Sequence, residues 1–108
     1  MEETKSVFLE YFGSSPYMKI LDFLIQGQDF DYSMTEIAKG AEVGWSAFTN
    51  IWKQMLEKKI ISQTRTIGNA KLFKLNRENH FVEGLIKLDW KLTKLENDKL
   101  TKKKIIIS

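Results

Sequence analysis

Five side chains in the middle of the chain place an indole, two hydroxyls, an amide and an amine on one expected helix face. They are Trp45, Ser46, Thr49, Asn50 and Lys53, within a predicted helix at about residues 44–59. An asparagine amide pairs bidentately with adenine, a threonine offers a hydroxyl and a methyl to thymine, and a lysine suits phosphate or guanine. Arginine is missing from this set, which indicates A·T-leaning readout or weak base specificity. The alternative is an ordinary solvated helix face, against which an exposed tryptophan argues.

Two short amphipathic helices joined by a tight turn are needed to position this face. Apolar residues recur at helical spacing over residues 34–56, and the gap between Val43 and Phe48 resets their phase. The two helices should therefore meet at an angle around residues 42–44. In the second helix the side chains expected in the core are Phe48, Ile51, Trp52 and Met55.

A basic β-hairpin is predicted directly behind this helix, at about residues 61–75. Apolar and polar side chains alternate on either side of Gly68-Asn69, a pair that supplies the positive φ of a tight turn. Strict alternation would place the side chains of Ile61, Gln63 and Arg65 on one face of the hairpin and those of residues 62, 64 and 66 on the other. At the turn, Arg65, Asn69 and Lys71 are the groups expected to meet a nucleic-acid backbone or minor groove. The interpretation of this hairpin as nucleic-acid binding depends on its position directly after the two predicted helices.

The segments before the helix pair carry their own start and stop signals. Residues 7–12 suggest a short helix ending at Gly13, and Ser15 caps a helix that starts at Pro16 and stops at Gly27. The core side chains expected there are Ile20, Leu21, Phe23 and Leu24. Residues 30–32 could add an edge strand to the hairpin, and Ser33 with Glu36 forms a capping box for a helix ending near Gly40.

Charge is segregated along the chain. Residues 1–43 hold three lysines against eight acids, a balance of −5, whereas residues 44–108 hold fourteen basic against six acidic residues, a balance of +8. The net charge of +3 therefore conceals a basic half that contains the predicted reading helix and hairpin. Such a footprint is typical of polyanion binding, although the lysines near the C-terminus could equally solvate a helix face.

Composition excludes several other classes of protein. The 108 residues suit one domain with an appendage. There is no cysteine and the one histidine, His80, cannot build a metal site alone, so neither a disulfide framework nor a metal site is expected. No Ser/His/Asp set or phosphate-cradling glycine loop indicates an enzyme, and no cofactor is implied. No apolar run approaches the roughly 20 residues of a membrane span, and the start is acidic. A soluble cytoplasmic protein is therefore expected.

A long helix is predicted after the hairpin. Asn79 is a good N-cap, and the helix from Phe81 to Leu95 would be about 20 residues, or about 30 Å, if it continued to Lys99. Its apolar residues follow the alternating spacing of four and three found in a short coiled-coil seam, which predicts a homodimer through Phe81, Leu85, Leu88, Leu92 and Leu95. The alternative is that this helix packs on its own domain. Residues 101–108 form a basic tail with an apolar end, either touching DNA or pairing as a strand.

The stretch from Ser33 to Asn76 resembles the archaeal winged helix-turn-helix transcriptional regulators of the MarR/ArsR-like kind, and the similarity spans about residues 16–95. The matching landmarks are Ile37-Ala38, Val43, Phe48, Trp52, Ile60-Ile61 and Gly68. Two positions depart from the pattern: Gly44 replaces the usual Ser or Thr cap, and Lys59 replaces a glycine that commonly ends the recognition helix. The resemblance implies a dimeric DNA binder. The ArsR-type Cys/His sensor cluster is missing, so a metal-responsive version is not expected.

Together these observations predict a mainly α-helical chain with a small β-hairpin: a winged helix-turn-helix at 1–78, a dimerisation helix at 79–100 and a tail at 101–108. The expected function is a homodimeric regulator that binds double-stranded DNA. The alternative is a winged-helix module for protein contact in a transcription or assembly factor. No residue pattern identifies the operator, the regulated genes, the sign of regulation or a small-molecule effector.

Overall fold

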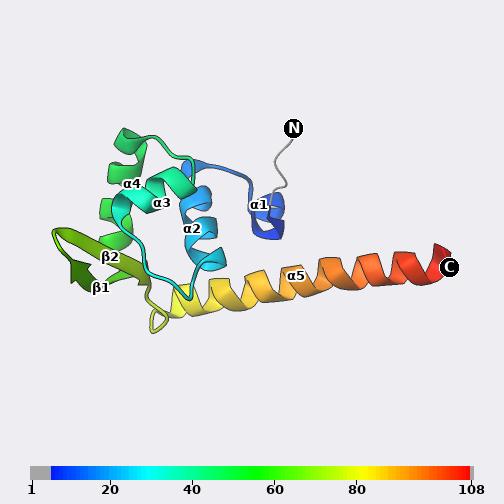
Figure 1. Cartoon of the computed structure of the whole chain (residues 1–108). Helices are drawn as coiled ribbons and strands as arrows, with labels where there is room; N and C mark the ends of the chain where they lie inside the picture. The colour runs from blue at the N-terminus through cyan, green and yellow to red at the C-terminus, as the bar shows by residue number, and fades with distance from the viewer. Residues whose placement is uncertain (1–5, 108) are drawn as a thin grey trace.

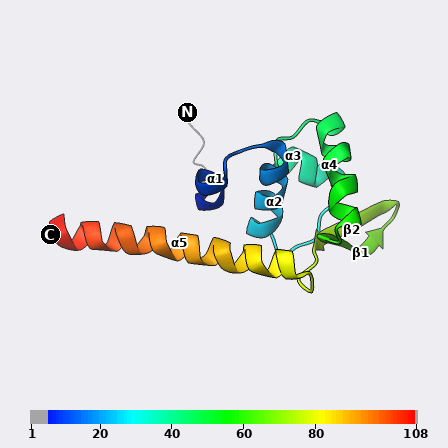
Figure 2. The ribbon, with the colours of Figure 1, turned by 180° about the vertical axis from the view of Figure 1, so that it is seen from behind.

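The chain folds into a winged helix-turn-helix followed by one long helix (Figure 1). The computed structural model describes the backbone of residues 6–107 and side chains up to Leu100. The elements are α1 (Val7–Phe12), α2 (Pro16–Gln26), α3 (Met34–Gly40), α4 (Trp45–Glu57), β1 (Ile61–Ile67), β2 (Ala70–Leu75) and α5 (His80–Ile107). The hairpin and the free end of α5 lie at opposite ends of the molecule, as the view from behind also shows (Figure 2).

The predicted helix starts are confirmed by their capping hydrogen bonds. Ser15 Oγ accepts from the Met18 amide at 3.3 Å, with Pro16 in the first turn of α2. At the start of α3, Ser33 Oγ accepts from the Glu36 amide at 3.2 Å while Glu36 Oε1 accepts from the Ser33 amide at 2.9 Å. Backbone amides that have no partner within the first turn of each helix are therefore bonded by side chains close in sequence. This is why the local sequence pattern was enough to predict both helix starts.

The core lies between α2, α3, α4 and the hairpin. Its largest fully buried members are Phe8, Ile20, Leu21, Leu24, Ile25, Ile37, Phe48, Met55, Ile60 and Val82. Two expected core residues are only half-buried at its margin, Phe23 and Ile51. Ile25, which was not expected to be buried, lies in the core. Phe23 instead packs its ring against Tyr32, with centroids 4.9 Å apart.

Helices α3 and α4 end in the same backbone motif. After α4, Lys59 has φ of 57°, its amide donates to the Leu56 carbonyl at 3.1 Å, and the Ile60 amide donates to Met55 at 3.0 Å. These paired bonds form a Schellman motif, and α3 ends likewise at Glu42 with φ of 58°. The sharp exit expected from a glycine is thus made by a lysine held in the left-handed region.

The wing carries a β-bulge that simple alternation did not predict. Gln63 pairs with Phe73 and Arg65 pairs with Leu72, so Thr64 is an extra residue on β1. The expected strict alternation of side chains along 61–66 is therefore wrong from Thr64 onward. A bulge of this kind turns the strand and redirects the side chains beside it.

The wing turn and its edge contact agree with the sequence pattern in outline. Gly68 has φ of 61°, whereas Asn69 is not among the residues with positive φ, which fits a turn that needs only its first central residue there. Tyr32 forms an isolated antiparallel bridge with Phe73. The edge strand predicted at residues 30–32 is confirmed in this minimal form.

The last helix is longer than predicted. The Asn79 side-chain oxygen accepts from the amides of Phe81 and Val82 at 2.8 and 3.3 Å, as expected of an N-cap. α5 then runs 28 residues to Ile107, so the expected end near Lys99 is wrong, and residues 101–107 continue the helix rather than forming a strand or a separate tail. Ser108 lies outside the described residues. In the described part of the chain, α5 and the other helices all lack the combination of length and hydrophobicity that a membrane span requires.

Candidate nucleic-acid interface

α4 divides into a buried apolar face and an open polar face. Phe48, Trp52 and Met55 are buried, and four of the five residues singled out from the sequence are exposed: Trp45, Ser46, Asn50 and Lys53. Thr49 is half-buried. The helix begins after Gly44, which provides no side-chain cap, so backbone amides at this end remain available to a ligand or water.

Thr49 is partly engaged by its own helix. Its Oγ1 donates to the Ser46 carbonyl at 3.0 Å, the local bond that threonines often make within helices. The hydroxyl proton is thereby occupied, and its lone pairs and methyl group are left for a base edge. Asn50, which is exposed, is the stronger candidate for bidentate recognition.

Trp45 begins a column of aromatic rings that ends in the wing. Its ring stacks on Phe48 at 5.4 Å, Phe48 stacks on Trp52 at 5.1 Å, and Trp52 meets Phe73 of β2 edge-on at 5.3 Å. Trp45 remains 53% exposed, so Phe48 covers only part of it. Trp52 Nε1 is buried without a hydrogen-bond partner among the described residues, at a cost of about 1–3 kcal/mol.

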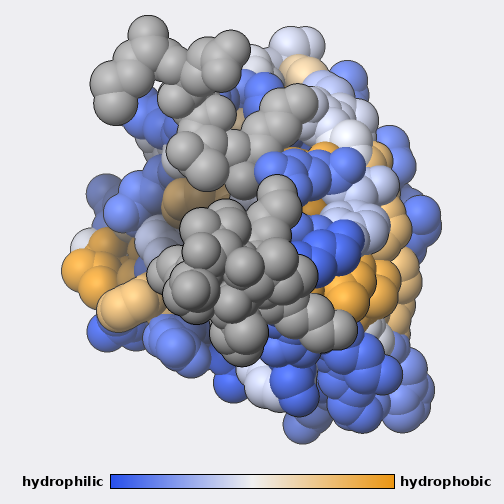
Figure 3. All heavy atoms as spheres, turned by 90° about the vertical axis from the view of Figure 1, so that its right-hand side faces the viewer, coloured by the Kyte–Doolittle hydropathy of each residue, from blue (hydrophilic) through white to orange (hydrophobic). Residues whose placement is uncertain are grey.

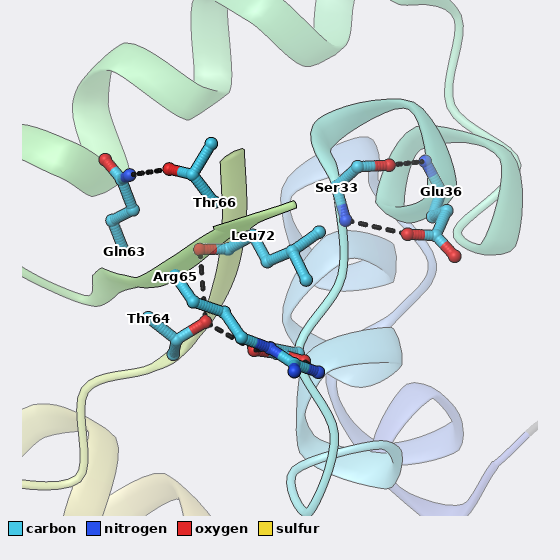
Figure 4. A network of polar contacts seen from close by, with 8 residues as sticks. Ser33, Glu36, Gln63, Thr64, Arg65, Thr66 and Leu72 are labelled. Atoms are coloured by element: carbon cyan, nitrogen blue, oxygen red, sulfur yellow. Dashed lines mark hydrogen bonds and ion pairs between the residues drawn. The ribbon is translucent and has the colours of Figure 1, made fainter. Parts of the chain in front are cut away.

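The wing presents its basic groups on an open surface. Asn69 and Lys71 are exposed beside the turn, and Lys71 pairs with Thr66 across the hairpin. Gln63 Nε2 donates to Thr66 Oγ1 at 3.2 Å along the same strand (Figure 4). Asn69 and Lys71, two of the three residues predicted at the wing tip, thus lie beside the turn.

Arg65 has an acidic partner that sequence reasoning missed. Its Nε donates to Asp31 Oδ2 at 2.9 Å and its Nη2 donates to Asp31 Oδ1 at 3.1 Å. The Thr64 hydroxyl donates to the same carboxylate at 2.5 Å, and its oxygen lies 3.3 Å from the Leu72 carbonyl (Figure 4). These bonds, with that of Arg65 first, lower the pKa of Asp31 to about 2. One signal was available: Asp31 sits in the short segment expected to lie along a basic hairpin.

The predicted dimer seam of α5 divides between two environments. Leu85 packs against the core and Leu92 is half-buried, so part of the seam rests on its own domain, as the alternative reading expected. Phe81, Leu88 and Leu95 are exposed. Farther along, Glu96 of α5 accepts from the Tyr11 hydroxyl of α1 at 3.2 Å. Figure 3, viewed from the side toward which α5 points, shows hydrophobic surface between hydrophilic residues.

Within the described residues, no three His, Asp or Glu side chains gather in a way that could hold an ion.

Comparison with known proteins identifies the fold. No family model and no curated protein sequence matches the chain. MepR, a transcription regulator of the Staphylococcus aureus multidrug efflux pump MepA, is 18% identical to this chain with a TM-score of 0.59. The match covers 91% of this chain and 79% of the MepR chain. ZitR of Lactococcus lactis, a zinc-responsive MarR family member also solved with DNA, is 17% identical with a TM-score of 0.56, covering 79% and 60%. Sso10a-2, a DNA-binding protein from Sulfolobus solfataricus, is 11% identical with a TM-score of 0.49, covering 82% and 88%. The matches to MepR and ZitR show that the chain has the winged-helix fold of MarR-like regulators, as the sequence resemblance predicted.

Proposed function

We propose that this protein is a homodimeric transcriptional regulator that binds double-stranded DNA. The observation that carries the proposal is the open polar face of α4, whose opposite face lies in the core, with a basic wing alongside. The fold shared with MepR and ZitR supports the proposal. MepR is a transcription regulator, and ZitR has been solved in complex with DNA. α4 is placed in the major groove, and the wing contacts the backbone or minor groove.

Individual roles follow from what each group can sense. Asn50 reads adenine, Thr49 contacts a thymine methyl, and Lys53 with the exposed start of α4 meets phosphate or guanine. Ser46 and Trp45 border this surface at the first turn of the helix. At the wing, Arg65, Asn69 and Lys71 meet the sugar-phosphate backbone, whose charge is the same at every sequence.

The homodimer rests on the exposed part of the α5 seam. Phe81, Leu88 and Leu95 fall seven residues apart, on one helix face, and each of them is at least 36% exposed. The distal part of α5 also runs beyond the other elements in both ribbon views (Figures 1 and 2). Two recognition helices related by a two-fold axis would bind a palindrome with half-site centres about 10 base pairs, or a multiple of that, apart.

The proposal is tested by separating base readers from backbone contacts. A preferred duplex is first selected from random DNA, and binding is then measured on it and on a mixed-sequence duplex across salt concentrations. Asn50→Ala should cost about 1–3 kcal/mol on the preferred duplex and little on mixed sequence. Lys71→Gln should weaken binding to both duplexes and reduce the slope of log affinity against log salt by about one unit.

The matched control is Lys87→Gln, which removes the same charge from the exposed side of α5, where Lys87 pairs with Glu83 at 3.4 Å. It should leave the salt slope close to that of the unmodified protein. If Asn50→Ala left the ratio of specific to nonspecific affinity unchanged and Lys71→Gln left the salt slope unchanged, the DNA-reading assignment would be wrong.

One observation favours the protein-docking alternative. Three large apolar side chains are exposed on the loop before α3, the start of α4 and the wing turn, namely Phe30, Trp45 and Ile67. Exposed apolar side chains of this size are common where proteins meet. Absence of any salt-dependent binding to duplex DNA in the experiment above would make this second function the better one.

A further inference from the structure

The Arg65–Asp31 pair joins the wing to the segment that precedes the helix-turn-helix. The Asp31 side chain is 15% exposed, whereas that of Arg65 is 62% exposed. The carboxylate is therefore largely covered while much of the arginine side chain faces solvent. Solvent screens an ion pair this open, so its geometry is more informative than its strength.

The bulge at Thr64 is what allows this geometry. Successive residues of a regular strand point to opposite faces, yet Thr64 and Arg65 both reach the carboxylate of Asp31. The extra residue in β1 breaks the alternation at this point and turns both side chains to one side. Bulges commonly serve to re-aim a side chain next to a functional site.

Asp31 is itself held in register with the wing. The amide of the next residue, Tyr32, donates to the Phe73 carbonyl at 2.9 Å, and the Phe73 amide donates back at 2.8 Å. Phe73 is buried in the core. The carboxylate is thus attached to the rigid body of the domain, and Arg65 is tethered to a fixed point.

The pairing leaves one edge of the guanidinium free. Asp31 takes the Nε hydrogen and one Nη2 hydrogen, out of five N–H donors. The remaining edge, with both Nη1 hydrogens and the second Nη2 hydrogen, has the fork geometry that receives a phosphate bidentately. We propose that Asp31 is a positioning residue for DNA binding, which holds Arg65 by one edge so that its other edge meets a backbone phosphate. This inference rests on the proposed function.

Two physical effects predict opposite signs for the loss of this carboxylate. Removing a negative charge near a polyanion should tighten binding through the overall field. Releasing Arg65 from its tether should weaken binding, because a mobile side chain must be ordered when the complex forms. Since the charge change is the same anywhere on the loop, a neighbouring acid separates the two effects.

Asp29 provides that matched control. It lies two residues earlier on the same loop and pairs with Arg77 at 3.3 Å, away from Arg65, and its side chain is 84% exposed. Affinity for a mixed-sequence duplex is measured for Asp31→Asn and Asp29→Asn, because phosphate contacts do not depend on sequence. Asp31→Asn should weaken binding by about 5- to 20-fold. Asp29→Asn should leave it unchanged or slightly tighter.

A double-mutant cycle tests whether Asp31 acts through Arg65. In an Arg65→Gln background, Asp31→Asn should no longer weaken binding, because there is no guanidinium left to position. A merely structural role for Asp31 would weaken binding equally in both backgrounds. Thermal unfolding of each variant, followed in parallel, identifies any loss of fold.

Tighter binding by Asp31→Asn, equal to that of Asp29→Asn, would show that Asp31 acts only through its charge and would overturn the inference while leaving the DNA-binding proposal intact. An equal loss in both backgrounds would also overturn it. If the unmodified protein failed to bind the duplex at low salt, the proposed function and the inference would both be wrong.

Discussion

Replacing Lys59 with glycine should stabilise the protein, although it removes a side chain from the end of α4. Lys59 has φ of 57°, in the left-handed region that L-residues reach at a cost of about 1–2 kcal/mol. Its role in the Schellman motif depends on its backbone, since its amide bonds to Leu56 and its carbonyl accepts from the Asn76 and Asn79 side chains at 3.0 Å. A glycine would keep all of these bonds.

The expected gain is the relieved strain less the added entropy of the unfolded chain. Glycine costs about 0.5–1 kcal/mol through its greater freedom when unfolded. The difference leaves a net stabilisation of about 0.5–1 kcal/mol for Lys59→Gly. For a domain of this size, that amount corresponds to a rise in Tm of roughly 2–8 °C.

Lys58→Gly is the matched control for this substitution. Lys58 is the C-cap of α4 and has φ of −83°, which any residue adopts without strain. Both variants lose one lysine and its side chain, but only Lys59→Gly relieves a left-handed conformation. Urea unfolding followed by circular dichroism should therefore show Lys59→Gly above the unmodified protein and Lys58→Gly below it. Equal destabilisation by the two would refute the assignment of strain to Lys59.

Three further outcomes are expected. Gly40→Ala should destabilise by about 1–3 kcal/mol in urea unfolding, because its Cβ would lie 2.1 Å from Phe23 Cε1, whereas Gly84→Ala meets nothing within 4 Å and should stabilise α5. The pKa of Asp31 is lowered from 3.8 to about 2 in the folded protein, so the contribution of its carboxylate to stability is present above about pH 4 and is lost toward pH 2. The difference in urea midpoint between the unmodified protein and Asp31→Asn should therefore shrink as the pH falls over that range. Leu88→Lys with Leu95→Lys should give monomers in light scattering while Leu100→Lys, exposed on another face of α5, should not; an unmodified protein that is monomeric at high micromolar concentration would contradict the dimer.

The elements that sequence predicted best are those specified by residues close together in the chain. The capping box of Ser33 and Glu36, the Ser15-Pro16 start and the Gly68 turn each depend on fewer than five consecutive residues. The alternation of apolar residues then located both strands of the wing. Local chemistry is complete at these positions, so no knowledge of the rest of the fold was required.

What the sequence did not reveal depends on contacts between distant segments. The exchange of Phe23 for Ile25 in the core follows from how α2 meets α3 and Tyr32, which helical periodicity alone does not determine. The bulge at Thr64 and the pairing of Arg65 with Asp31 link positions more than thirty residues apart. The length of α5 was underestimated because the coiled-coil pattern fades after Leu95, while the lysine-rich segment beyond it still favours helix.

The aromatic column from Trp45 to Phe73 constrains how α4 and the wing can move relative to each other. Each ring is a rigid plate in contact with the next, and the column runs from the first turn of α4 through Phe48 and Trp52 to the second strand of the wing. Tilting α4 relative to the hairpin would have to open at least one of these contacts. α4 and the wing therefore move as one rigid body, and in the proposed complex it is the DNA duplex that would have to deform to fit them.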